Sequence, residues 1–373
     1  MRLRSSLWVL VFALLCCSTI FAQQTGSISG RVTATDGSAL PGVTVEGRSN
    51  VLPQPRVTVT DGAGDYRLPA LIPGDYTVTF SLAGMQTVNR KATVILSQNT
   101  VADVKLGLQG VAETITVTAA ATLVDKESTA LQSGLTSDQI RQLPITQNYS
   151  DLQKLIPGVM YNPDTVRGPS AGASGQDNVY LFDGVNITMP LFGVLNAGSS
   201  DPNNHDIAQV TVLRGGAKAT DFDRAGGFQI DTVTKSGTNK WSGEAGYEVL
   251  NKNFVANQTG SQILTYQQNR SWANVNAGGP ILRDRLYFYG SYYRPQFKKD
   301  NQANVYGDLP QYKLDRTDWF GKATFTPLGS LLLNGSYRTS KSDETPSSFG
   351  STQAATTGTE FKGKLKIATL EGS

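Results

Sequence analysis

From Trp241 onward, apolar and polar residues alternate along the chain with a period of two residues. Successive side chains of a strand point to opposite faces of a sheet, so this alternation predicts strands with one apolar and one polar face. The segments that carry it begin near Trp241, Ala273, Leu286, Trp319, Leu331 and Phe361. Each has about the 9 to 11 residues that a tilted strand needs to cross a bilayer. We therefore expect residues 239–373 to form strands of an antiparallel transmembrane β-barrel.

The polar side chains predict which face of this sheet meets water. Lys362, Lys364 and Lys366 share one face of the last segment, and a lysine facing lipid at the bilayer midplane costs about 2 to 4 kcal/mol. These lysines are therefore expected on the concave side, toward the lumen. The outward face is expected to carry Trp241, Tyr247, Phe288, Trp319, Phe325, Leu331, Leu333 and Phe361. A soluble sheet would also accept the lysines, but the aromatic density of "LYFYGSYYR" is typical of membrane-barrel girdles.

These segments are too few to close a membrane barrel by themselves. The smallest common membrane barrels have about eight strands, and barrels with a plugged lumen have about 22. The sequence is therefore interpreted as an amino-terminal part of a larger protein, with an incomplete barrel.

Residues 1–22 are expected to be a secretory signal peptide and not a spanning helix. Arg2 and Arg4 precede a short apolar run, and Ala22 offers a small residue for cleavage. Cys16 and Cys17 both lie inside this segment, so the mature chain would need no disulfide. The chain has 33 basic and 30 acidic residues, a balance that gives no electrostatic case for a nucleic-acid partner.

Residues 23–108 alternate short apolar-polar segments with clusters of Gly, Pro and Asp. Strands at this spacing predict a small Greek-key β-sandwich. Gly64 is expected to take a positive φ, and Tyr66 and Tyr76 are expected in the core with hydroxyls that cap a corner. The expected strands are 27–32, 43–47, 57–60, 66–68, 76–82, 92–96 and 101–106.

The stretches "SGRVTATDGSALPGVTV" and "VTDGAGDYRLPALIPGDYTVTF" in this unit resemble the carboxypeptidase regulatory-like domain. The resemblance implies a carbohydrate-binding-like sandwich fold over nearly the whole unit. Two roles are open for it, namely binding of a sugar or protein partner and service as a structural spacer. We favour the spacer because no cluster of exposed aromatic residues marks a sugar platform.

One strand-like segment stands alone in the linker of residues 109–120. An acidic residue followed by alternating β-branched residues has high strand propensity, yet nothing on either side closes a hairpin onto it. It resembles the TonB box of TonB-dependent receptors, which pairs with the edge of a periplasmic energy-transducing protein. The partner-binding residues so implied are Glu113, Thr114, Ile115, Thr116, Val117, Thr118 and Ala119.

Residues 121–238 form a second, glycine-rich unit for which an α+β fold is expected. A capped helix is expected at Ser137 and another at 149–155, with strand pieces at 210–213 and 228–234. The stretches "GASGQDNVYLFDGVNI" and "DIAQVTVLRGGAKATDFDRAGGFQIDTVTKSGTNKWSGEAGYEV" resemble the plug of TonB-dependent receptors. In that family an arginine at this place contacts acidic residues of the barrel wall, which implies a plug latch at Arg214, Gly215 and Gly216. The alternative is a solvated arginine beside a turn.

These resemblances imply a mainly β receptor or transporter in the outer membrane of a Gram-negative-type bacterium, with the sandwich in the periplasm. The implied partners are a periplasmic TonB-type protein, outer-membrane lipid and an extracellular ligand, for which carbohydrate is one candidate. No cofactor and no enzyme activity are expected. The alternative is a secreted carbohydrate-binding or adhesive sandwich protein, whose later strands would form a second soluble sheet.

Sequence context disfavours catalytic and metal sites. Residues 168–172 match the G-x-S-x-G nucleophile elbow, but no apolar strand precedes them and no helix follows. His205 is the only histidine, which removes most transition-metal sites, and a triad with Asp201 or Asp206 has the wrong chain order or context. Residues 221–232 begin like a calcium loop, but Thr232 stands where the loop requires a glutamate.

Overall fold

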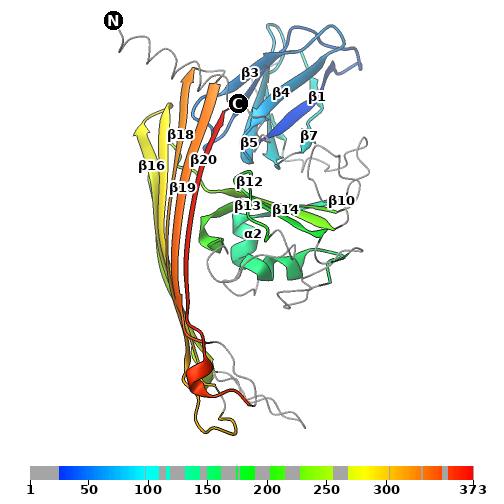
Figure 1. Ribbon diagram of the computed structural model, residues 1–373. Helices are drawn as coiled ribbons and strands as arrows, with labels where there is room; N and C mark the ends of the chain where they lie inside the picture. The colour runs from blue at the N-terminus through cyan, green and yellow to red at the C-terminus, as the bar shows by residue number, and fades with distance from the viewer. Residues whose placement is uncertain are drawn as a thin grey trace, which may run out of the picture.

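The computed structural model describes residues 25–96, 98–108, 115–117, 131–142, 149–160, 174, 177–189, 202–214, 227–254, 268–301, 303–328, 331–346 and 352–372. These residues form an amino-terminal sandwich, a smaller mixed sheet with short helices, and a tall curved sheet (Figure 1). The mainly β fold is therefore confirmed, whereas the expected signal peptide lies outside the described residues. No helix in the described part of the chain has the length and apolar character needed to cross a membrane.

Two sheets pack face to face in the sandwich. One contains β4 (Asp65–Leu71), β1 (Gly26–Ala34), β7 (Asn99–Val101) and β8 (Val104–Leu106). The other has the order β3 (Arg56–Val59), β2 (Thr44–Arg48), β5 (Gly74–Ser81), β6 (Val88–Val94) and β9 (Ile115–Val117). The strand expected at 101–106 is divided because β7 and β8 pair with successive parts of β1, and the Ala102 amide donates to the Ser29 carbonyl between them.

The turn and corner expectations for the sandwich are confirmed. Gly64 has a φ of 76°, and a Cβ at this position would lie 2.5 Å from the Val32 carbonyl oxygen. The Tyr66 hydroxyl donates to the Ala102 carbonyl at 2.7 Å, and the Tyr76 hydroxyl donates to the Ile72 carbonyl at 2.8 Å. Both rings are buried, so each phenol satisfies its polar atom inside the core.

We predict that residues 23–108 fold on their own. Apart from Leu332 of the tall sheet, the buried members of their core come from within this segment, so the unit carries its own apolar burial. The purified segment should give one cooperative thermal transition without added metal. Calorimetry with and without a chelator measures this, and a transition that needs calcium or zinc would contradict the prediction.

The middle unit is a five-stranded mixed sheet flanked by short helices. Its order is β10 (Leu131–Thr136), β13 (Ile207–Arg214), β14 (Phe228–Thr234), β11 (Val179–Phe182) and β12 (Val185–Asn186). Helix α2 (Ser137–Gln142) starts where expected, because the Gln139 side chain accepts from the Thr136 amide at 2.9 Å in a capping box. The second expected helix is a 3₁₀ helix, η1 (Tyr149–Leu155), and another, η3 (Asn204–Asp206), precedes β13.

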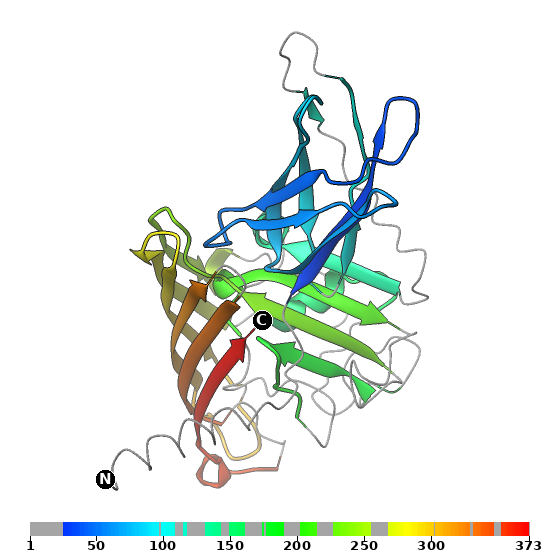
Figure 2. The same ribbon diagram turned by 90° about the horizontal axis from the view of Figure 1, so that it is seen from above.

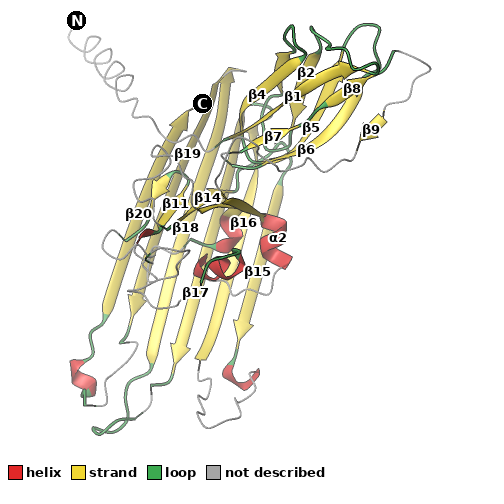
Figure 3. Cartoon of the chain, turned by 90° about the vertical axis from the view of Figure 1, so that its right-hand side faces the viewer, coloured by secondary structure: helices red, strands yellow, loops and turns green. Residues whose placement is uncertain are grey.

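The tall sheet contains six antiparallel strands in chain order. They are β15 (Ser242–Leu250), β16 (Gln268–Leu282), β17 (Leu286–Lys299), β18 (Tyr312–Leu328), β19 (Leu331–Glu344) and β20 (Phe361–Gly372). The sheet is open and curved, and the middle unit lies on its concave side (Figures 2 and 3). At the sandwich end the neighbouring strands end and begin close together in the sequence, at Leu282 and Leu286 and at Leu328 and Leu331. At the far end the strand bounds are farther apart, at Leu250 and Gln268, at Lys299 and Tyr312, and at Glu344 and Phe361.

The expected orientation of the lysines in β20 is wrong. Ile367 pairs with Arg338 and Leu365 pairs with Ser340, and both partners are buried on the concave side. The alternation therefore places Lys362, Lys364 and Lys366 on the convex face, together with exposed Trp319 and Tyr337. Phe361, expected outside, pairs with Glu344 and lies on the concave face.

The error came from placing these lysines at the bilayer midplane. Strands β16 to β19 have 14 to 17 residues, which exceeds the 9 to 11 or so that a crossing requires. The lysines lie toward the far end of β20, beyond the apolar part of the convex face. A charged residue there can face outward without entering the hydrocarbon.

Candidate functional site

The hairpin between β11 and β12 forms the first of three contacts between the middle unit and the tall sheet. Asp183 and Gly184 form its turn with φ values of 44° and 74°, the type I′ geometry that an Asp-Gly pair favours. This turn places Asp183 against the wall, which we define as the concave face of the tall sheet.

A buried ion pair joins the hairpin to the wall. The Lys322 ammonium lies 3.3 Å from a carboxylate oxygen of Asp183, and the two side chains are 8% and 3% exposed. Asp183 also accepts from the Thr234 amide at 3.0 Å and from the Thr234 hydroxyl at 2.6 Å. Lys322 donates to that same hydroxyl at 3.0 Å. Because the charges are desolvated and fully engaged, loss of either one would leave the other uncompensated.

An aromatic contact also packs the same hairpin against β18. The Phe182 ring meets the Phe320 ring edge-on, with centroids 6.3 Å apart. The Arg338 guanidinium lies 5.5 Å from the Phe182 ring centroid. It also lies 3.2 Å from Asp318, a carboxylate that it shares with Arg316 at 3.0 Å. The hairpin is therefore held by apolar packing as well as by charge.

A second contact joins the start of β13 to the wall. The Tyr289 hydroxyl donates to Asp206 at 3.0 Å, and Asn203 donates to the same carboxylate at 3.3 Å. Burial raises the pKa of Asp206 above its ordinary value, although bonds from Ser291 and Tyr289 oppose that shift. This carboxylate belongs to the contact between the two units and is not open to a ligand.

A third contact lies at the first strand of the wall sheet. Arg141 at the end of α2 pairs with Glu244 of β15 at 2.9 Å. His205 Nε2 lies 3.7 Å from a Glu248 oxygen, but burial lowers the pKa of His205 to about 4. His205 is therefore neutral at neutral pH, so Arg141–Glu244 is the ion pair of this contact. Burial also lowers the pKa of the adjacent Lys235 to about 8.

The predicted latch at Arg214 is placed differently from these contacts. Arg214 ends β13, where its backbone pairs with Leu131 and Phe228, and its guanidinium packs over Gly158. Among the described residues it has no acidic partner, while Gly215 and Gly216 lie outside them. The wall contacts instead use Asp183, Lys322, Asp206 and Arg141. The Asp-Gly hairpin signal in "LFDGV" could have pointed to Asp183, but no local pattern pairs it with Lys322.

The strand expected in the linker pairs with a strand of the sandwich. Its described residues form β9, which runs parallel to β6 with Val88 opposite Ile115 and Arg90 opposite Val117. β9 is thereby the edge strand of the second sandwich sheet. The rest of the predicted box, Glu113, Thr114, Thr118 and Ala119, lies outside the described residues. A strand added at a sheet edge is held mainly by backbone hydrogen bonds, so a competing edge can replace its partner.

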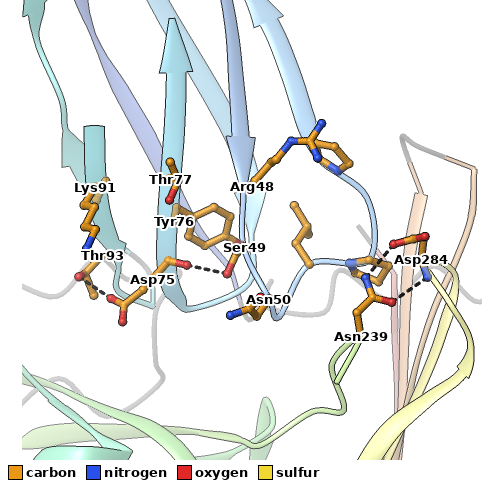
Figure 4. Close-up of a pocket in the computed structure, with 14 residues that line it drawn as sticks. Arg48, Ser49, Asn50, Asp75, Tyr76, Thr77, Lys91, Thr93, Asn239 and Asp284 are labelled. Atoms are coloured by element: carbon orange, nitrogen blue, oxygen red, sulfur yellow. Dashed lines mark hydrogen bonds between the residues drawn. The ribbon is translucent and has the colours of Figure 1, made fainter. Parts of the chain in front are cut away.

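A cleft of about 770 Å³ lies between the sandwich and the rim of the tall sheet (Figure 4). On the sandwich side Asp75 is engaged by the Thr93 hydroxyl at 2.8 Å, and on the rim Asn239 and Asp284 bond each other at 2.7 and 3.0 Å. Its one aromatic lining residue, Tyr76, is 2% exposed. The described lining of the cleft therefore holds no exposed ring on which a sugar would stack.

Comparison with known families accounts for all three units. The carboxypeptidase regulatory-like domain matches residues 27–107, the TonB-dependent receptor plug domain matches 124–227, and an outer membrane beta barrel domain matches 233–363. The curated TonB-dependent transporter Oar of Myxococcus xanthus is 27% identical over 317 residues, which is 80% of this chain and 29% of Oar. The chain belongs to the TonB-dependent receptors.

A solved outer membrane transporter shares the fold. The outer membrane transporter YddB of Escherichia coli is 18% identical with a TM-score of 0.52, covering 65% of this chain and 36% of YddB. The siderophore receptor PirA of Acinetobacter baumannii is 19% identical with a TM-score of 0.46, covering 59% of this chain and 32% of PirA. This TonB-dependent receptor chain therefore spans about a third of the solved receptors and less of Oar. It is an outer-membrane protein whose plug is the middle unit and whose wall is the tall sheet.

The buried histidine of the plug predicts how plug stability in this TonB-dependent receptor depends on pH. His205 takes up a proton near pH 4 in the folded plug and near pH 6.5 when unfolded. Between those values the unfolded state binds more protons, so stability falls as the pH drops through that range. At pH 5 the loss is about 2 kcal/mol, which raises the equilibrium constant for opening of β13 by roughly 30-fold.

Hydrogen exchange of the β13 amides at pH 7 and pH 5, corrected for intrinsic rates, measures this loss. His205→Gln removes the titration and should abolish most of the difference. Asp206, whose raised pKa acts in the opposite direction, is present in both proteins, so the comparison isolates His205. An equal pH response in the two proteins would contradict the assignment.

Proposed function

We propose that this receptor chain takes part in the uptake of an extracellular ligand across the outer membrane, with energy supplied through residues 113–119 by a periplasmic TonB-type protein. The proposed domains are the sandwich at 23–108, the linker at 109–120, the plug at 121–238 and the first barrel strands at 239–373. The supporting observation is a plug held on a barrel wall by a buried ion pair, with an edge strand beside the sandwich that can be exchanged.

The mechanism begins with a strand exchange. β9 is bound to one edge of the sandwich by parallel pairing with β6, and the TonB-type protein offers a competing edge. When β9 leaves β6 and pairs with that edge, tension passes along the linker to the plug. The first described plug element it reaches is β10, which lies at the end of the plug sheet and pairs there only with β13.

Opening of a path for the ligand then requires some of the contacts between the plug and the wall to break. Loss of β10 exposes the edge of β13. This strand directly follows Asp206 of η3, which accepts a hydrogen bond from the Tyr289 hydroxyl. The Asp183–Lys322 pair lies on the opposite side of the plug sheet. We propose that this pair keeps β11 and β12 in place while β10 and its neighbours move, because a desolvated pair is costly to separate.

The cleft beside the sandwich bears on the class of ligand. A carbohydrate was one candidate because of the sandwich's resemblance, but the cleft beside the sandwich offers no exposed ring. The proposed ligand is an extracellular molecule that is taken up across the outer membrane. The family consists of transport proteins, and we propose no enzyme activity.

The adhesin alternative requires a second sheet that covers the apolar side of the tall sheet. Trp319 and Phe325 lie on the convex face and are 56% and 37% exposed, with no described residues layered over that face (Figure 2). This exposed apolar face fits lipid better than water.

Capture of the TonB-type protein tests the proposal. A peptide that covers 111–121 should retain the periplasmic domain of that protein, and free peptide should elute it. A peptide with the same composition in scrambled order serves as the control. Equal retention by the two peptides would reject residues 113–119 as the coupling strand.

A further inference from the structure

The sandwich contacts the tall sheet through one leucine of the wall. Leu332 of β19 is 1% exposed and belongs to a hydrophobic cluster whose other members all lie in the sandwich. It precedes Asn334 by two residues, so the alternation of the strand places it on the concave face, at the sandwich end of β19. Without the sandwich this side chain would face the water of the lumen. The contact therefore holds the sandwich against this end of the wall.

A second contact joins the sandwich to the plug. Ile95 directly follows β6, and a Cβ added at Gly134 of β10 would lie 3.4 Å from Ile95 Cγ2. The same Cβ would lie 3.6 Å from Gln209 Nε2, so these three residues meet on one side of the plug sheet. Helices α2 and η1 pack on the opposite side (Figure 1). The sandwich therefore lies over the side of the plug sheet that the helices leave open.

This side of the plug sheet is polar. The register places Thr211 opposite Asp231 and Leu213 opposite Gln229, on the side of Gln209. Gln209, Thr211 and Gln229 are 4%, 4% and 7% exposed, and their Oε1, Oγ1 and Oε1 atoms have no protein partner among the described residues. Such groups need water or a protein partner, whereas layers that pack permanently bury apolar faces. This side of the plug is therefore suited to meeting water.

The contacts that hold the sandwich in place are small. Among the described strands, none in the sandwich forms an extended contact with a strand of the plug or the wall. The cleft of Figure 4 separates Arg48 and Asn50 of the sandwich from Asn239 and Asp284 of the rim. Burial of one leucine side chain contributes roughly 10- to 100-fold to an equilibrium constant. An interface that depends on so few apolar side chains can open without unfolding either unit.

The sandwich end of the tall sheet is the periplasmic end. Membrane barrels have short periplasmic turns and longer extracellular loops. At the sandwich end the strand bounds lie close together in the sequence, at Leu282 and Leu286 and at Leu328 and Leu331. A ligand that passes the plug on its way inward therefore meets the sandwich last.

We propose that the sandwich is a releasable lid on the periplasmic side of the plug. When it is docked through Leu332 and Ile95, it keeps Gln209, Thr211 and Gln229 from the periplasm. When it is undocked, that side of the plug is open for release of the ligand. The lid is a regulatory element of the proposed uptake and rests on that function for the direction of transport, but it does not depend on the coupling strand.

Thiol labelling of the full receptor, purified from outer membranes in detergent, measures opening of the lid. Thr211→Cys reports from the covered side, and Val212→Cys reports from the helix side of the same strand, where Val212 is 1% exposed. A sulfonated maleimide is the probe, read by mass spectrometry of the peptide that contains the reporter. Leu332→Asp should speed labelling of Thr211→Cys by roughly 10- to 100-fold and leave Val212→Cys unchanged. Leu332→Met keeps an apolar side chain of similar volume and should label like the parent.

The contact with the plug supplies an independent variant. Gly134→Leu places a side chain against Ile95 and should also speed labelling of Thr211→Cys. Gly134→Ala adds only a Cβ at ordinary contact distance and should not. No coupling protein and no ligand are used, so a failure of residues 113–119 as the coupling strand would leave these results unchanged. Fast labelling of Thr211→Cys in the parent, unchanged labelling in both Leu332→Asp and Gly134→Leu, or equal acceleration at Val212→Cys would each overturn the lid.

Discussion

Replacing Lys322 by methionine should lower the free energy of opening of the plug by about 3 to 5 kcal/mol, because Asp183 would remain buried without its countercharge. Asp183 is 3% exposed and keeps only the two bonds from Thr234 after this change. Asp183→Asn should cost less than an alanine replacement would, because asparagine tolerates the left-handed φ of 44° found here. Amide exchange of β11 and β14 measures both losses.

The double variant separates the pair from its surroundings. Lys322→Met with Asp183→Asn removes both charges, so its cost should be smaller than the sum of the single costs by about 2 kcal/mol or more. The exposed pair Lys252–Asp300, with side chains 42% and 40% exposed, supplies the control. Lys252→Met should change plug exchange by well under 1 kcal/mol. Additive costs at Asp183 and Lys322 would show that the pair does not hold the plug.

Proline at Ile115 or Val117 should abolish capture of the TonB-type protein. Proline has no amide hydrogen and cannot complete the ladder that an added strand needs. Alanine at the same positions keeps every backbone donor and should weaken capture only modestly. Retention of the periplasmic domain by immobilised receptor measures the effect.

The opposite edge of the same sandwich sheet provides the control for this prediction. Val57 lies in β3, which forms that edge, and its side chain is 59% exposed. Val57→Pro should leave capture unchanged. If the Ile115→Pro protein were retained as well as the wild type, backbone pairing at β9 could not be the basis of coupling.

Local sequence signals predicted the elements whose structure is decided by neighbouring residues. Gly64 took its positive φ, α2 began at its Thr-x-x-Gln capping box, and the period of two after Trp241 gave strands. These outcomes depend on turn chemistry, capping and side-chain alternation, all of which act within a few residues.

Contacts between distant segments could not be predicted in the same way. Asp183 and Lys322 are 139 residues apart, and only the packing of the plug on the wall brings them together. The partner of β9 was missed because β6 offers a parallel edge, which leaves no hairpin signal in the sequence. The orientation of Lys362, Lys364 and Lys366 was wrong because alternation fixes which residues share a face but not the depth of each residue in the membrane.

Cross-linking in cells tests most directly whether residues 113–119 couple this receptor to an energy source. Thr116→Cys is placed in β9 and Val57→Cys in β3, in a chain whose two native cysteines, Cys16 and Cys17, both precede the sandwich. With a cysteine on the TonB-type protein, Thr116→Cys should form a disulfide-linked complex and Val57→Cys should not. Absence of the complex at Thr116, or equal amounts at both positions, would contradict the account.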